Sequence, residues 1–140
     1  MRFDLPFPEV ICRFFQRFIE AQIPLDVSAL DMDWHAHSYG YQVNHDLFPN
    51  MSSFIEWLHL RNKSIYFNDH ALQRKRTLSP EEVAYRFRGL SKLLEIGLDF
   101  WWVDCHWRYK PRPLAVPGEA EPVHLITWAQ AVYRWIQLRW

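Results

Sequence analysis

The spacing of apolar side chains predicts four helices that are separated by short apolar runs. Apolar residues recur every third or fourth position in residues 8–22, which is typical of an amphipathic helix. The same spacing predicts helices over residues 50–61 and 79–97, the second of which begins with a Ser-Pro-Glu-Glu helix-start sequence. A fourth helix is expected from about residue 127 to residue 140.

Three short apolar runs lie between these helices and predict β-strands. They cover residues 25–33, 64–68 and 98–104, and each contains or is followed by acids or amides. A helix followed by three strand-helix pairs is typical of right-handed βαβ crossovers and a parallel sheet. Eight such units would need roughly 290 residues, within the range of a (β/α)8 barrel.

The sequence therefore predicts an α/β fold, a partial (β/α)8 TIM barrel with about three parallel strands and four helices. We expect residues 1–140 to be a fragment of a catalytic barrel, because the chain stops inside an apolar helix without a closing Gly or Asn. Two open strand edges would favour self-association. A small self-sufficient α/β domain is the alternative.

Composition and charge exclude several classes of protein. With 49% apolar and 23% charged residues the chain is not a disordered tail. Basic and acidic residues balance at 16 each, so nucleic acid and anionic membranes are not expected partners, and no run approaches the roughly 18 apolar residues of a membrane helix. Cys12 and Cys105 lack disulfide-scaffold or zinc-site spacing, and no signal peptide is apparent, so a cytoplasmic location is the default.

Asp104, at the end of the third predicted strand, is the main candidate for chemistry. Strand alternation places Phe100, Trp102 and Asp104 on one face, so that a carboxylate lies above aromatic rings. Such a carboxylate can attack an anomeric carbon, because the resulting glycosyl ester is released again by activated water. The simpler interpretation is an Asp that caps a helix or bridges loops.

Two acids and two histidines end the first predicted strand. Alternation places Asp31 and Asp33 on one side, facing the barrel mouth, where paired carboxylates can bind sugar hydroxyls or a metal ion. His35 and His37 have the His-x-His spacing of amidohydrolase-type barrels. A metal-dependent hydrolase using His35, His37 and Asp104 is therefore one alternative, and a solvent-exposed loop is the simpler interpretation of the histidines.

Polar residues after the second and third strands would complete a pocket. Asn68, Asp69 and His70 end the second strand, where polar side chains either line a pocket or anchor a loop. His106 is placed to shape the pocket rim. A dyad of Cys105 and His106 is not expected, because neighbours in an extended segment point to opposite faces.

Four motifs in this order resemble the catalytic barrel of family 31 glycoside hydrolases. They are Leu-Asp-Met-Asp-Trp-His at residues 30–35, Tyr-Gln-Val-Asn-His-Asp-Leu-Phe-Pro at 41–49 with Trp-Leu-His at 57–59, Tyr-Phe-Asn-Asp-His at 66–70, and Gly-Leu-Asp-Phe-Trp-Trp-Val-Asp at 97–104. The resemblance covers roughly residues 24–133.

The resemblance implies a retaining α-glycosidase that acts on a carbohydrate, and we expect neither a cofactor nor a metal ion. Matching the motifs makes Asp104 the nucleophile and Asp31 the acid that binds sugar hydroxyls, with Asp33 as its support. Trp102 would form part of the pocket wall. The family's general acid lies on a later strand, so no residue here takes that role and the chain alone is expected to be inactive. A non-catalytic sugar-binding remnant is a further alternative.

Overall fold

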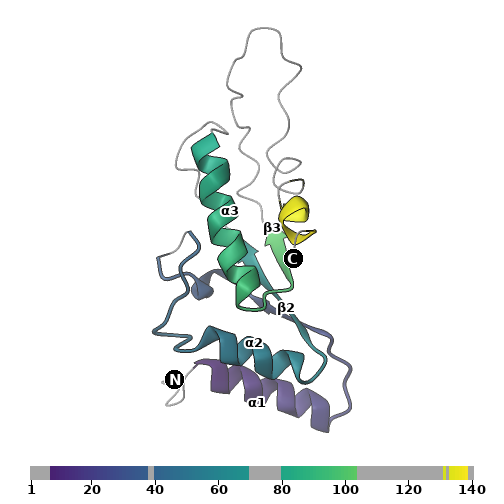
Figure 1. The fold of residues 1–140 in the computed structure, drawn as a ribbon. Coiled ribbons are helices and arrows are strands. Elements are labelled where there is room, and N and C mark those ends of the chain that lie inside the picture. The colour runs from purple at the N-terminus through teal and green to yellow at the C-terminus, as the bar shows by residue number, and fades with distance from the viewer. Residues whose placement is uncertain (1–6, 38–39, 70–79, 104–130, 132, 139–140) are drawn as a thin grey trace.

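The computed structural model of the chain describes residues 7–37, 40–69, 80–103, 131 and 133–138. Three parallel strands form one sheet in the order β1 (Val27–Leu30), β2 (Ser64–Asp69), β3 (Phe100–Val103), as Figure 1 shows. The helices are α1 (Phe7–Glu20), α2 (Met51–His59) and α3 (Pro80–Glu95), and residues 133–137 are also helical. The predicted order of helices and parallel strands is confirmed.

The helix ends follow the local chemistry that the sequence indicates. The Asn50 side chain accepts a hydrogen bond from the backbone N–H of Ser53 at 3.0 Å, which satisfies a donor at the start of α2. Asn62 and Gly97 have φ values of 54° and 103°, so the chain leaves α2 and α3 through left-handed residues. These turns bring the chain directly into β2 and toward β3.

The end of β1 differs from the prediction. The expected strand over residues 25–33 is extended only from Val27 to Leu30, and a 3₁₀ helix, η1 (Met32–Trp34), follows. The indole Nε1 of the fully buried Trp34 donates to the backbone carbonyl of Asn68 at 2.7 Å. Because this bond pulls the chain toward β2, the strand alternation that assigned Asp31 and Asp33 to one face does not extend to Asp33.

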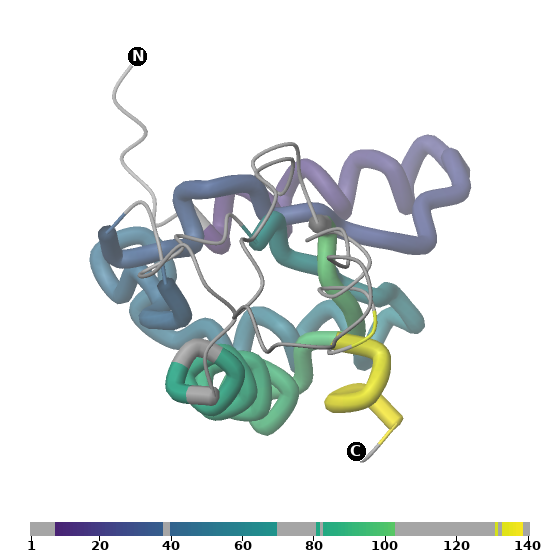
Figure 2. The backbone as a smooth tube through the Cα atoms, turned by 90° about the horizontal axis from the view of Figure 1, so that it is seen from above, coloured from purple at the N-terminus to yellow at the C-terminus, as the bar shows by residue number. Residues whose placement is uncertain are grey.

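The two faces of the sheet have different surroundings. Leu30, Ile65 and Phe67 are buried on the face that α2 and α3 cover. Seen from above in Figure 2, α3 and residues 133–137 lie on the same side of β2 and β3. On the opposite face, Phe100 and Trp102 are exposed at 36% and 37%. The predicted alternation along β3 is therefore confirmed for these two residues.

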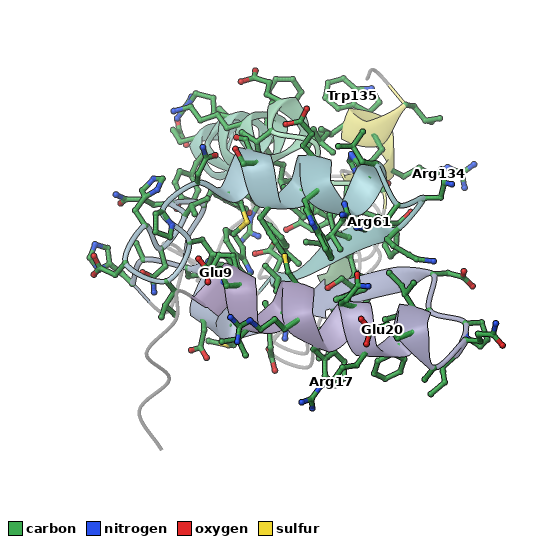
Figure 3. All side chains as sticks on the ribbon, turned by 90° about the horizontal axis from the view of Figure 1, so that it is seen from below. Glu9, Arg17, Glu20, Arg61, Arg134 and Trp135 are labelled. Carbon is green, nitrogen blue, oxygen red and sulfur yellow. The ribbon has the colours of Figure 1, made fainter. Side chains whose placement is uncertain are left out.

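The first two helices pack against each other and complete the core. Figures 1 and 3 show α1 beside α2. The Phe15 ring meets Trp57 edge to face at 6.3 Å, and the Arg61 guanidinium lies 4.0 Å above the same indole. In the described part of the sheet, β1 and β3 each have one edge without a neighbouring strand, and the self-association expected there stays a prediction. No helix among the described residues is long and apolar enough to cross a bilayer.

Gly89 permits a close approach between α3 and the loop before α2. A Cβ atom at this position would lie 2.0 Å from Cδ2 of Tyr41. We expect Gly89→Ala to lower the free energy of unfolding by about 1–3 kcal/mol, because this overlap outweighs the gain of about 1 kcal/mol that Ala ordinarily gives a helix. Urea unfolding of Gly89→Ala in the natural chain measures the net effect of the overlap and the helix preference of Ala. The same substitution in a Tyr41→Ala background measures the helix preference without the overlap. Stabilisation in both backgrounds would contradict the packing.

Candidate functional site

The structure brings Asp31 and Asn68 together at the carboxyl end of the sheet. Asn68 Nδ2 donates to Asp31 Oδ1 at 2.6 Å, and the backbone N–H of Met32 donates to the same oxygen at 2.8 Å. Asp31 is exposed, and its Oδ2 accepts no hydrogen bond from a described residue. This oxygen is therefore available to a ligand's hydroxyl group.

Asn68 and Trp102 lie on the face of the sheet that points away from the helices. They are register partners on β2 and β3, so their side chains emerge on the same face. Asn68 is fully buried, whereas the Trp102 ring is partly exposed and meets Tyr66 edge to face at 6.3 Å. The Asp31–Asn68 pair and the partly exposed Trp102 indole together form a surface that can bind a sugar ring. The polar pair can bind the hydroxyl groups of the sugar, and the indole can pack against its apolar face.

Asp33 occupies a different environment from that of Asp31. It lies in η1, is exposed, and has its backbone carbonyl bonded to Asn44 Nδ2 at 3.3 Å. No hydrogen bond joins its side chain to Asp31 in the described part of the chain. Both acids border a cavity of about 400 Å³ beside α1 and the free edge of β1, with mostly apolar walls. The supporting role of Asp33 stays a prediction.

Three predicted site residues, His70, Asp104 and His106, lie outside the described residues. Their roles therefore stay predictions. The strand register ends with Asp69 beside Val103, one residue before Asp104.

The metal-site alternative finds no support in the described residues. The His35 ring is 3% exposed and stacks on Trp34 with 3.7 Å between ring centroids, whereas His37 is exposed. Among the residues that the structure describes, no group of three His, Cys, Asp or Glu side chains is arranged to hold a metal ion. His35 thus contributes to the packing around Trp34.

A buried polar cluster on the helix side of β2 was not predicted from the sequence. Its members are Tyr41, Asp69, Arg86 and Tyr133. The Tyr133 hydroxyl donates a hydrogen bond to Asp69 Oδ2, and Arg86 Nη1 donates to the Tyr133 oxygen at 3.3 Å. The Tyr41 hydroxyl donates to Asp69 Oδ2 over 3.5 Å. The available signal was Arg86 itself, which lies on the apolar stripe of α3 and is 1% exposed.

Burial controls the protonation of this cluster. It raises the pKa of both Tyr41 and Tyr133 well above the ordinary value, and the negative charge of Asp69 adds to the effect. Both phenols therefore keep their protons to a higher pH than exposed tyrosines do, and they donate to the carboxylate. Since Asp69 and Asn68 are neighbours on β2, they point to opposite faces. The cluster anchors the end of β2 from the helix side, directly behind Asn68.

Comparison with known proteins shows the family to which the chain belongs. Residues 8–85, more than half of the chain, match the family model described as the glycosyl hydrolases family 31 TIM-barrel domain. The matched region contains β1 and β2 with Asp31, Asp33 and Asn68, and it ends before Trp102. No curated protein sequence matches the chain. The match and the three parallel strands with their covering helices show that the chain belongs to glycosyl hydrolase family 31 and contains part of its TIM-barrel domain.

Proposed function

We propose that the chain carries the nucleophile and part of the sugar-binding pocket of a retaining α-glycosidase. Membership of the family indicates a glycoside hydrolase. In the proposal Asp104 attacks the sugar, Asp31 and Asn68 bind its hydroxyl groups, and Trp102 forms a wall. His70 and His106 complete the rim. The observation that carries the proposal is the 2.6 Å bond between Asp31 and Asn68, which joins the polar ends of two adjacent strands on one face.

Asp31 suits the role of a hydroxyl acceptor. Two donors fix its Oδ1, so the carboxylate has one orientation, while Oδ2 remains available in the described part of the site. Hydrogen bonds to an ionised carboxylate are shorter and stronger than neutral ones. A sugar hydroxyl that donates to Oδ2 would therefore be held in a defined direction relative to β2 and β3.

The proposed reaction has two displacement steps at the anomeric carbon. In the first, a bond forms between an Asp104 carboxylate oxygen and the anomeric carbon as the bond to the leaving oxygen breaks, and a general acid protonates that oxygen. In the second, a water molecule loses a proton to the conjugate base and displaces Asp104. Two inversions retain the α configuration. The resemblance assigns the acid to no residue of this chain, so the chain alone is expected to be inactive on unactivated glycosides.

A 5-fluoro-α-glycosyl fluoride tests the nucleophile separately from the acid. Fluoride leaves without protonation, so a chain without a general acid can still form the glycosyl ester, and the ring fluorine slows its release. We expect mass spectrometry of the labelled 140-residue chain to place the added mass on Asp104. Asp104→Asn should lose the label, whereas the matched control Asp26→Asn, an exposed acid before β1, should keep it.

Other outcomes distinguish the alternatives. A label on Asp31, Asp33 or Asp69 would remove the assignment of Asp104. Reversible binding of the fluoride without an adduct would instead indicate a sugar-binding protein without catalysis. Parallel incubation with each of several fluorinated sugars would identify the sugar that the pocket accepts.

A further inference from the structure

A second hollow lies on the outer, helix side of the sheet. It measures about 540 Å³ and opens between α3 and the loop before α2. This volume is in the range of small-molecule sites. Its lining residues are Tyr41, Gln42, Tyr85, Arg88, Gly89 and Lys92. The hollow is separate from the proposed glycosidase pocket, because the Tyr41 hydroxyl reaches Asp69 on the face of β2 opposite to Asn68.

Two cations border this hollow, and neither is paired with an acid among the residues that the structure describes. Arg88 and Lys92 are exposed, lie four residues apart on α3, and form no ion pair or hydrogen bond with any described residue. Glu95 follows on the same helix but is not paired with Lys92. Like charges at this spacing repel each other. An anion between them would remove the repulsion, and the planar guanidinium of Arg88 suits the two oxygens of a carboxylate or phosphate.

The remaining lining favours a ring-shaped polar ligand over a bare anion. The Tyr41 and Tyr85 rings are 5.4 Å apart at an angle of 55°, and the Tyr41 ring packs directly onto the helix backbone at Gly89, so the two rings form one aromatic wall of the hollow. Aromatic rings pack against the C–H face of a sugar, and the exposed amide of Gln42 can both donate to and accept from its hydroxyl groups.

We propose that this hollow binds a sugar that carries an anionic group, either a carboxylate or a phosphate. The cations Arg88 and Lys92 hold the anionic group, and Tyr41, Tyr85 and Gln42 hold the ring. This site requires none of the residues of the proposed glycosidase pocket, so the two proposals stand or fall separately.

Titration of the ¹⁵N-labelled 140-residue chain by NMR at low ionic strength tests the proposal. The probes are glucuronic acid and glucose 6-phosphate. The controls are the two halves of such a ligand measured separately, the uncharged sugar glucose and the anion inorganic phosphate. We expect at least one anionic sugar to bind about tenfold more tightly than either half, with the largest shifts at Gln42, Tyr85 and Arg88. The tighter of the two anionic sugars identifies the group as a carboxylate or a phosphate. Added salt should weaken binding.

Charge-removing variants localise the effect. Arg88→Gln and Lys92→Gln should each weaken the binding by about fivefold, whereas Arg17→Gln, an exposed cation on α1 that Figure 3 labels, should leave it unchanged. Equal binding of glucose, glucuronic acid and glucose 6-phosphate would overturn the proposal, as would equal weakening by Arg17→Gln. Inorganic phosphate binding as tightly as glucose 6-phosphate would indicate an adventitious anion only. Shifts confined to Asp31 and Asn68, or no binding at about 10 mM, would also refute it.

Discussion

Replacement of Arg86 by methionine is expected to lower the free energy of unfolding by about 3–5 kcal/mol. Arg86 is 1% exposed and donates to the Tyr133 hydroxyl, which in turn donates to the buried Asp69 carboxylate. Methionine fills a similar volume but removes the positive charge. The carboxylate keeps its hydrogen bonds from Tyr41 and Tyr133 but loses a nearby positive charge, and the loss of a compensating cation from a buried carboxylate is costly. Such a loss is a large share of the 5–15 kcal/mol that ordinarily stabilises a domain.

Urea unfolding of the two arginine variants of α3 provides a matched comparison. Arg88 lies two residues further along the same helix, is exposed and makes no hydrogen bond with a described residue, so Arg88→Met should change stability by less than about 0.5 kcal/mol. The Arg86→Met, Asp69→Leu double variant should recover part of the loss, because it removes the buried negative charge as well. Equal effects of Arg86→Met and Arg88→Met would contradict the buried cluster.

The second large effect is a loss of stability in alkaline solution. Burial and the charge of Asp69 raise the pKa of Tyr41 and Tyr133 in the folded chain well above the ordinary value of about 10. As the pH rises above about 10, the unfolded chain loses both phenolic protons while the folded chain keeps them. The unfolded state then binds fewer protons, so stability decreases with pH by up to about 2.7 kcal/mol per unit for the two groups. The decrease continues until the folded phenols also ionise.

Variants of these tyrosines isolate this contribution from that of other titrating groups. The free energy of unfolding is measured from about pH 9 to about pH 11. In Tyr41→Phe its decrease with pH should be less steep than in the natural chain, by up to about 1.4 kcal/mol per pH unit. The Tyr41→Phe, Tyr133→Phe double variant should lose up to twice that amount. A slope that is the same in the natural chain and the double variant would show that these phenols ionise as readily in the folded chain as in the unfolded one.

Most of the fold follows from local sequence patterns. The helix spacing, the Asn50 cap and the left-handed exits at Asn62 and Gly97 act within a few residues, so the sequence alone predicts them. The end of β1 could not be predicted in the same way. It depends on the bond between the Trp34 indole and the Asn68 carbonyl, which joins residues 34 positions apart.

The candidate site was predictable on one face of the sheet and not on the other. Polar residues at the ends of adjacent parallel strands meet at one edge, which is sufficient to bring Asp31 near Asn68. The cluster behind them depends on Tyr133, which lies 64 positions from Asp69 and belongs to a helix of ordinary amphipathic pattern. Nothing in the local sequence around Tyr133 distinguishes it from a core aromatic residue.

The opposite orientations of Asn68 and Asp69 make β2 tolerant of substitution and intolerant of length change. A library randomised at Asp31, Asn68 and Trp102 alters side chains that face away from the helices, so many members should retain the native helix packing. One residue inserted before Asn68 would exchange the two orientations, placing an acid on the face of the proposed sugar pocket and an amide beside Arg86. Homologues that vary in selectivity should therefore differ by replacements in this strand and not by insertions or deletions.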